Sequence, residues 1–458
     1  MNKEKIEYII NKCLSTGADF AEVFYEDTIK KTYELVDSKI KDVFIKKCRG
    51  IGIRVALGTD VVYGSTNLLD DESIDNLINS LISRFNSTIK ISNVNLELES
   101  VKDINEVVGS FDMWSNEDKV NYLKHIDDVA RINSLITQVK GYLLETKRNI
   151  TIGNSFGKLV NNTNHNLRLQ VIFYADNNIN QASTYLSLGG STSYNIFDNY
   201  DIDKEVLDKV NKAILKLDAK DFKGGELPVI LGPGFGAVIF HEACGHGLEA
   251  TSVSIGESVF CNKLNTKVAS DKVTLIDDGT LNNYWGSNSI DDEGNVTKRN
   301  VLIENGILKS YLIDYLNSRK LNLDSNGCSR RENYNYMPTS RMSNTYLACG
   351  NDSIEDMIKS IDLGVYCTDM GGGSVNPITG DFNFSVDDAY LIENGEITTH
   401  IKGISLIGNS RDILMNVEMV SNDLNHACGM CGSTSGSIPV NVGQPTIKVS
   451  KILVGGRE

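Results

Sequence analysis

The chain has 458 residues, of which 41% are hydrophobic and 23% are charged. This length exceeds one ordinary hydrophobic core, and a prior of about 150 residues per domain predicts two or three domains. The 60 acidic residues outweigh the 45 basic ones and give a formal charge of −15, which would repel nucleic-acid phosphates. Because no Lys/Arg-rich run offsets this charge, we expect no direct binding to nucleic acid.

The sequence predicts a cytoplasmic protein without membrane contact. The first 20 residues, MNKEKIEYIINKCLSTGADF, lack the apolar segment of a secretion signal and are typical of an amphipathic helix. The longest apolar stretch, LPVILGPGFGAVIF at 227–240, is too short for a bilayer and is broken by glycine and proline. Nine cysteines without a regular framework fit a reducing compartment.

The first 95 residues predict a helix, then strands, then a second helix. Helical spacing covers 5–17, and a capped helical pattern covers 70–85. Between them, four runs alternate apolar and polar residues and are expected to be separate strands: 21–26, 31–37, 41–47 and 50–57. This order favours an α+β unit with an antiparallel sheet.

The next segment, 105–220, repeats that mixture. Helices are predicted over 115–133 and 203–217, and LRLQVIFYAD at 167–176 is typical of a strand. Two asparagine-rich stretches, NNTNHN at 161–166 and DNNINQ at 176–181, predict exposed turns.

KDFKGGELP at 220–228 is interpreted as a linker between two domains. We therefore predict an N-terminal α+β domain over 1–220, divisible into 1–95 and 105–220, and a C-terminal domain over 221–458.

The C-terminal half predicts a mostly antiparallel β domain, barrel- or sandwich-like. Two similar hairpins with a central Asn-Gly occur at 301–312 (VLIENGILKSYL) and 389–401 (AYLIENGEITTHI). One short helix, around HEACGH at 241–246, interrupts this pattern and carries the candidate chemistry. The fold class is therefore α+β.

HEACGH places Glu242 directly after His241, as in zinc peptidases, but the second histidine, His246, comes one residue late. Residues five apart lie roughly 140° apart around a regular α-helix, whereas a π-type turn brings them back toward one face. Gly245 would tolerate such a distorted turn. On a regular helix, His241 with Cys244 or Glu242 with His246 would share a face instead, and a pair of hydrogen-bonded core histidines is the ordinary alternative.

A catalytic zinc site needs a third protein ligand. The tail motif HACGMCG offers His426, Cys428 and Cys431, and no second C-x-x-C is present to complete a structural zinc site. One of these cysteines is therefore an attractive third ligand. A competing interpretation of the preceding segment, GPGFGA, is a dinucleotide site, because Gly232, Gly234 and Ala237 match G-x-G-x-x-[GA] after a strand.

Long ordered motifs of the C-terminal half resemble the TldD/PmbA metallopeptidases, whose TldD-type members carry H-E-x-x-x-H. The motifs are HEACGHGLEA, KVASDKVTLIDDGT, DDEGNVTKRNVLIENGILKSYL, MPTSRMSNTYL, GGGSVNPITGDFNFSVDDAYLIENG and GMCGSTSGSIPVNVGQPTIKVSKILVGG. The N-terminal half is similar mainly in layout and in short pieces such as GADFAEV. The intact metal motif and GMCG match the TldD-type subunit.

The resemblance implies a zinc-dependent peptidase that acts on unfolded or extended peptides. It implies His241, His246 and Cys431 as zinc ligands, and Glu242 as the group that takes a proton from water and passes it to the leaving amine. It also implies a homodimer, or a heterodimer with a related PmbA/TldE-type subunit. Cys244 departs from the family pattern and would be a spare thiol near the metal.

Two alternatives stay open at this point. A non-catalytic binding subunit could keep a metal for structure alone, and an oxidoreductase could use GPGFGA to bind NAD. Arg341, in MPTSRMSNT, could bind a carboxylate, but a structural ion pair is the stronger expectation.

Overall fold

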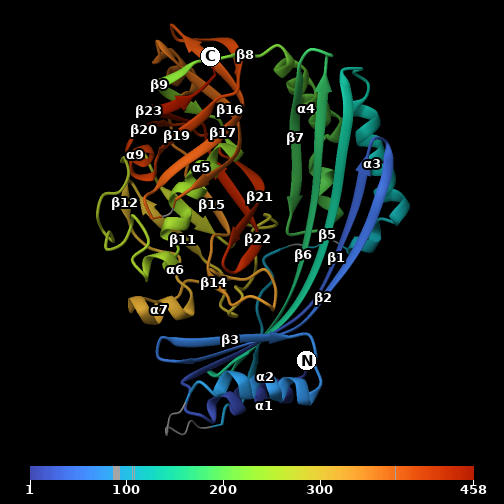
Figure 1. The fold of residues 1–458 in the computed structure, drawn as a ribbon, viewed down its shortest axis with the longest axis vertical. Helices are drawn as coiled ribbons and strands as arrows, with labels where there is room; N and C mark the ends of the chain where they lie inside the picture. Colours follow the sequence, from blue (N-terminus) through green and yellow to red (C-terminus); the bar gives the residue numbers. More distant parts are fainter. Residues whose placement is uncertain (86–92, 106, 108, 377, 458) are drawn as a thin grey trace.

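The computed structural model describes residues 1–85, 93–105, 107, 109–376 and 378–457. Long strands run along one side of the molecule for most of its length, and a β-rich C-terminal region lies beside them (Figure 1). This arrangement of helices with largely antiparallel sheets confirms the predicted α+β class.

The first sheet has the strand order β3-β2-β1-β5-β6-β4, and β7 also pairs with β6. Its strands are β1 (Phe20–Val36), β2 (Lys39–Leu57), β3 (Asp60–Thr66), β4 (Glu97–Glu99), β5 (Ile136–Asn154), β6 (Lys158–Asp176) and β7 (Gln181–Gly190). The four short strands expected between 21 and 57 are fused into β1 and β2, because the residues between the predicted runs continue the antiparallel ladder. Since β1 pairs with both β2 and β5, the segments 1–95 and 105–220 share this one sheet.

Helices cover the two ends of this sheet. α1 (Lys3–Leu14) and α2 (Asp71–Ile82) pack at the lower end in Figure 1, and α3 (Asn116–Ala130) and α4 (Ile202–Leu217) pack at the upper end. Each begins at a side chain that accepts a backbone N–H of the first turn; the N-cap residues are Asn2, Asp70, Ser115 and Asp201. The predicted helices are therefore confirmed.

One of the two predicted asparagine turns is wrong. NNTNHN lies inside β6, where side chains form hydrogen bonds between β5 and β6: Thr151 with Asn161, and Thr163 with Asn149. Cross-strand hydrogen bonds of this kind allow a polar run to stay extended. The other stretch does turn, and Asn178 has a positive φ of 66° between β6 and β7.

The C-terminal region contains a sheet that closes on itself. Its order is β16-β9-β23-β19-β17-β18-β8, and β16 also pairs with β17, so five strands form a barrel. The strands of this sheet are β8 (Lys220–Asp221), β9 (Gly224–Leu231), β16 (Leu363–Val375), β17 (Asp381–Glu393), β18 (Glu396–Lys402), β19 (Ser405–Asn409), β20 (Val417–Val420) and β23 (Ile447–Gly455). Most of the linker expected at 220–228 lies in strands, because its first two residues form β8 and its GGELP portion begins β9. The division of the chain at residue 220 stays a prediction.

A second C-terminal sheet has the order β12-β11-β10-β15-β22-β21. Its strands are β10 (Leu275–Asp278), β11 (Arg299–Glu304), β12 (Ile307–Leu308), β15 (Asn344–Leu347), β21 (Asn425–Ser433) and β22 (Gly436–Gln444). Smaller elements complete the region: β13 (Ser329–Arg330) paired with β14 (Thr339–Ser340), and the helices α6 (Ala250–Val253), α7 (Tyr315–Leu321), α8 (Ile354–Lys359) and α9 (Ser410–Met415).

Both predicted Asn-Gly hairpins are present. They connect β11 to β12 and β17 to β18, and their turn residues have positive φ angles: Asn305 (47°), Gly306 (80°), Asn394 (52°) and Gly395 (79°). Both central residues of each turn therefore have the left-handed backbone that a type I′ turn requires.

A hydrophobic core between the barrel and the second sheet fixes the segment around HEACGH. Val449 of the barrel, Phe240 next to the motif and Leu275 of the second sheet belong to the same buried cluster. A short helical segment held on both sides in this way is not free to move.

A buried ion cluster connects the first sheet to the C-terminal region. Glu22 of β1 accepts from Arg54 at 2.6 Å and from Arg331 at 2.7 Å, and Arg54 also donates to Glu293 at 2.7 Å. All four side chains are 3% exposed or less. Removing one member of such a cluster would leave a charge buried without a partner, so it ties the two regions together.

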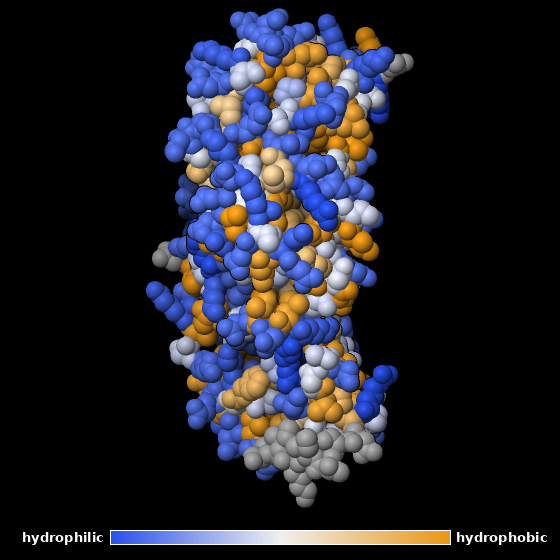
Figure 2. Space-filling model, turned by 90° about the vertical axis from the view of Figure 1, so that its left-hand side faces the viewer, coloured by the Kyte–Doolittle hydropathy of each residue, from blue (hydrophilic) through white to orange (hydrophobic). Residues whose placement is uncertain are grey.

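No helix of the described residues is long and apolar enough to cross a membrane. Figure 2 shows the outer side of the C-terminal region, where hydrophobic side chains form separate groups between hydrophilic ones.

Candidate metal centre

The segment that carries the two histidines changes its helical winding at the motif. After β9 come a 3-10 turn (Gly234–Ala237), the short helix α5 (Val238–Phe240) and a π-helical turn (His241–Gly245). The backbone N–H of His246 donates to the C=O of His241, which is an i to i+5 bond. The π-type turn predicted from the histidine spacing is therefore confirmed.

Gly245 has a different role from the one expected. Its φ of −57° and ψ of −52° are ordinary helical values, so no positive φ requires a glycine. A Cβ at this position would instead collide with the side chain of Met342. The glycine therefore allows the segment that carries Met342 to pack directly against the π turn.

The π turn brings the two imidazoles together with the thiol of Cys431. One donor atom from each of His241, His246 and Cys431 lies within 4.8 Å of the other two. The Cys431 Sγ is 3.3 Å from Nε2 of His246, and the two rings meet edge to face with centroids 5.3 Å apart. Three soft or borderline donors around one point match the ligand set of a catalytic zinc site.

The alternation of side chains along β21 decides which tail cysteine reaches the histidines. Cys428 and Cys431 are three residues apart, so they point to opposite faces of the strand. The thiol of Cys428 donates to the carbonyl of Gly189 in β7, and His426 packs against the rings of Tyr284 and Tyr346.

Cys244, the spare thiol near the motif, is fully buried among hydrophobic side chains. Burial raises the pKa of its thiol far above the usual range. This environment is that of a small core residue rather than of a reactive thiol.

Two residues that the motif analysis did not assign to the metal centre hold the donors in place. Glu249 is buried and contacts Nδ1 of His246 at 3.1 Å, which turns Nε2 toward Cys431. Arg341, 0% exposed, lies 3.7 Å from Glu249 and donates at 2.6 Å to the backbone carbonyl of Cys431. Arg341 thus forms the expected structural ion pair, and it links two of the three donor residues.

The electrostatics of the group favour a thiolate. Burial alone would raise the pKa of the Cys431 thiol, but the charges and hydrogen bonds of His241 and His246 outweigh it and lower the pKa to about 3. Burial lowers the pKa of His246, but the charge of Glu249 and the bonds to Cys431 and Glu249 raise it well above its usual range.

The residues present fit a bound cation. Nδ1 of His241 is buried and has no hydrogen-bond partner among the described residues. A polar atom buried without a partner is costly, so the chain itself does not satisfy this imidazole fully. The donor atoms of His241, His246 and Cys431, one from each residue, all lie within 4.8 Å of one another and are close enough together to bind one ion. Two imidazoles and a thiolate favour zinc among the common divalent ions.

Glu242 lies at the exposed side of the donor group. Its Oε2 is 3.6 Å from Nε2 of His246, and 30% of its side chain is exposed to solvent. A carboxylate that adjoins the donors and also reaches water can exchange protons with a reacting molecule there.

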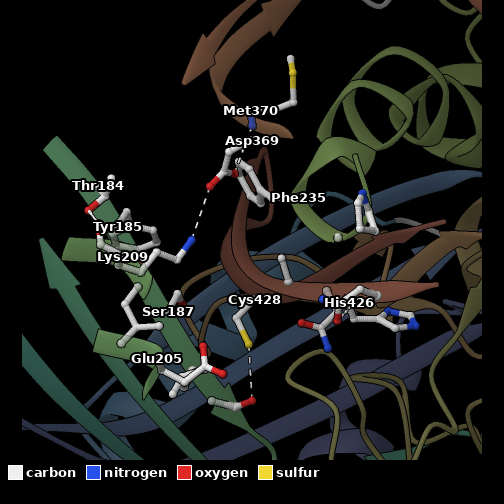
Figure 3. Close-up of a pocket in the computed structure, with 18 of the residues that line it drawn as sticks. Thr184, Tyr185, Ser187, Glu205, Lys209, Phe235, Asp369, Met370, His426 and Cys428 are labelled. Atoms are coloured by element: carbon white, nitrogen blue, oxygen red, sulfur yellow. Dashed lines mark hydrogen bonds and ion pairs between the residues drawn. The ribbon is translucent and has the colours of Figure 1, made fainter. Parts of the chain in front are cut away.

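A cleft of about 1000 Å³ lies between the first sheet and the C-terminal region. Figure 3 shows that side chains of β7 and α4 face β16 and β21 across it, and that Lys209 reaches Asp369 at 3.4 Å. Cys428 and His426 line this cleft, whereas the three donor residues and Glu242 do not. β21 therefore contributes one face to the cleft and the other to the donor group.

The dinucleotide interpretation of GPGFGA finds no support in this fold. The turn after β9 leads into a helical segment whose winding changes from 3-10 to α to π between Gly234 and Gly245, and β9 pairs with β23 in antiparallel fashion. The parallel neighbour of β9 is β16, which begins only at Leu363, so the two do not form a compact β-α-β unit. A pyrophosphate site of that type requires a long helix in a parallel β-α-β unit.

Comparisons with known proteins point to one family. The family model described as "PmbA/TldA metallopeptidase C-terminal domain" matches residues 224–456, and the model of domain 1 of the same family matches residues 21–84. A "Metalloprotease TldD homolog" from Buchnera aphidicola is 32% identical, covering 100% of this chain and 96% of the relative. The chain belongs to the TldD/PmbA family.

Two further similarities extend over nearly the whole chain. A "Zinc metalloprotease TldD homolog" from Saccharolobus solfataricus is 28% identical, and the similarity covers 98% of this TldD/PmbA chain and 99% of that relative. The crystal structure of TldE from Thermococcus kodakarensis has the same fold, with a TM-score of 0.76 at 19% identity, covering 99% of both chains. Its low identity makes it informative about the fold alone.

Proposed function

We propose that this TldD/PmbA protein is a zinc-dependent metallopeptidase that hydrolyses peptide bonds in unfolded or extended peptides. The observation that carries the proposal is the meeting of His241, His246 and Cys431 around one point with the carboxylate of Glu242 beside them. Relatives named metalloproteases support the reaction class.

His241, His246 and Cys431 would hold the ion. Zinc at this position supplies Lewis acidity, which activates water near neutral pH and polarises a carbonyl oxygen. Glu242 takes a proton from the attacking water and delivers it to the nitrogen of the departing amine. Glu249 and Arg341 keep His246 and the backbone of Cys431 in position during this cycle.

The proposed substrate is a chain in extended conformation. The cleft is bordered by β7 and β21, each of which is the last strand of its sheet in the described part of the chain. The outer backbone groups of such a strand can pair with an extended peptide where side chains do not already occupy them, as they do the carbonyls of Gly189 and Cys428. The peptide would continue past β21 to the donor group, which lies on the other face of that strand.

We further propose that the protein works in the cytoplasm as a homodimer, or as a heterodimer with a related PmbA/TldE-type subunit. A protein named TldE shares the fold of this chain, so a subunit of the same fold is a candidate partner.

Metal removal tests the proposed function. Dialysis against a chelator is expected to abolish cleavage of a denatured, reduced casein, and one equivalent of Zn²⁺ is expected to restore it. The assay is done with the chain alone and with a PmbA/TldE-type subunit added, and cleavage is followed by mass spectrometry. Cleavage that survives complete zinc loss would contradict the proposal.

Glu249→Gln is expected to weaken zinc binding by about 10- to 100-fold. The neutral amide of glutamine would form a weaker hydrogen bond with the N–H at Nδ1 of His246 than the carboxylate of Glu249 does, so the imidazole would be less well oriented. Competition with a chromophoric chelator measures the affinity, and the absorption of the Co²⁺-substituted protein reports the geometry of the donors. Glu257→Gln, a nearby exposed glutamate, is the matched control and is expected to bind zinc normally. Equal zinc affinities of the Glu249→Gln and Glu257→Gln proteins would show that Glu249 does not support the metal centre.

A further inference from the structure

One side of β2 has no neighbouring strand over twelve residues. β1 pairs with β2 along one edge, and β3 pairs with the other edge only from Ile51 to Leu57. No described strand pairs with the remaining portion, Lys39–Gly50, on that side; we name it the β2 edge. In Figure 1 it lies on the outer right of the first sheet, and α3 packs on β1 and β5 instead.

The β2 edge combines an apolar centre with basic ends. Val43, Phe44 and Ile45 are 43%, 52% and 68% exposed, although they are consecutive large hydrophobic residues. The sequence KIKDVFIKKCRG has five basic residues and one acidic residue, a net charge of +4 in a chain of −15. Lys41 and Lys47 contact carboxylates of β1 but keep 66% and 57% of their side chains exposed.

Lysines on an edge strand often serve only to prevent pairing with other chains. That explanation accounts for the ends of the β2 edge but not for its centre. A protected edge is normally short, bulged or charged in the middle. The β2 edge has a bulge at Lys41, near one end, but it is regular from Asp42 to Gly50 and exposes three hydrophobic residues there.

A second copy of the chain is a poor occupant. Two identical antiparallel strands related by a two-fold axis place one residue opposite itself. Whichever residue between Lys39 and Arg49 takes that place, at least one pair of like charges comes to lie opposite one another. Centring on Phe44 brings Lys41 near Lys47 and Lys39 near Arg49, twice each, against two attractive pairs of Asp42 with Lys46. Centring on Ile45 brings Lys41 near Arg49. Directly opposed like charges destabilise a strand pair.

We infer that the β2 edge is a docking site for an extended, acidic segment of a different polypeptide, which adds to the first sheet as an outer strand. The favoured segment carries apolar residues at its centre, opposite Val43–Ile45, and carboxylates at both ends, opposite the basic residues. Backbone hydrogen bonds would provide affinity, and the charges would select the partner and exclude a second copy. The inference does not depend on the metal centre.

Binding of a designed peptide to the full-length protein tests this inference. The probe is a fluorescein-labelled peptide as long as the β2 edge, with valines at its centre and glutamates at both ends, and its anisotropy is followed. Lys46→Glu combined with Lys47→Glu is expected to weaken binding by about tenfold or more, because attractive pairs become repulsive. Lys263→Glu combined with Lys298→Glu changes the net charge equally at exposed positions elsewhere and is expected to have little effect.

Three controls separate strand addition from other causes. The same peptide with N-methylated backbone amides must lose binding, and the same peptide with lysines in place of glutamates must bind much more weakly. A single-stranded oligothymidylate must not compete with the acidic peptide. The inference is overturned if the probe does not bind, if the methylated peptide or the oligothymidylate binds equally well, or if sedimentation reveals a dimer that the Lys46→Glu and Lys47→Glu changes dissociate.

Discussion

Replacing Cys431 by alanine is expected to remove zinc from the protein and to reduce peptidase activity to background. Among the described residues, the thiolate is one of three donors that meet at the centre, and it carries the negative charge of the set. Two imidazoles alone would leave the ion with too few protein ligands for a stable catalytic site. Zinc content after dialysis, measured by mass spectrometry, should fall from about one equivalent to nearly none.

Two other cysteines provide matched controls. Cys428 is three residues away on the same strand but faces β7, and Cys244 lies inside the motif but is buried in the core. Cys428→Ala and Cys244→Ala are therefore expected to retain zinc, whereas His246→Ala should lose it as Cys431→Ala does. Circular dichroism establishes that each variant is folded. Zinc retained by folded Cys431→Ala, or lost from Cys244→Ala, would mean that a different donor set binds the metal.

The π turn could be predicted because it is a local property. Two histidines five residues apart can share one face only if the helix is wound more loosely, and this requirement does not depend on the rest of the fold. The hairpins at Asn305-Gly306 and Asn394-Gly395 were predictable for the same reason, since their turn residues are adjacent in the sequence.

The choice between Cys428 and Cys431 is not local. The sequence implies that they face opposite sides of a strand, but the side that faces the histidines depends on how β21 pairs with β22 and where that sheet lies. Arg341 and Glu249 are separated by about 90 residues, and their contact likewise exists only in the folded chain. Residues that support a site from a distance therefore escape motif analysis unless a resemblance identifies them.

Strand length was misjudged where polar residues interrupt apolar alternation. β1 has 17 residues and β6 has 19, and each contains a polar stretch that was predicted to be a break or a turn. In β6 these residues hydrogen-bond to their neighbours in β5, so tertiary pairing overrides their local preference for turns. A strand inside a wide sheet has such partners available, and a sequence pattern does not reveal them.

Glu242→Gln is expected to lower the turnover number by about 10²- to 10⁴-fold while zinc stays bound. Glutamine has the same shape and can still contact Nε2 of His246, but it cannot accept the proton of the attacking water. The Michaelis constant should change little, since glutamine keeps the size and shape of the side chain and loses only its basicity. Steady-state cleavage of a quenched fluorescent peptide, beside zinc analysis and with Glu257→Gln as the control, measures both quantities.

This variant also separates the two remaining interpretations of the metal centre. A subunit that keeps zinc only for structure would lose neither zinc nor the activity of its complex when Glu242 is replaced, because the carboxylate would have no proton to transfer. A peptidase keeps its metal and loses its turnover. A catalytic zinc site without its proton-transfer group cannot complete the departure of the amine. Unchanged turnover in a zinc-loaded Glu242→Gln protein would therefore mean that the reaction takes place at another site. That conclusion would hold even if His241, His246 and Cys431 all proved to be zinc ligands.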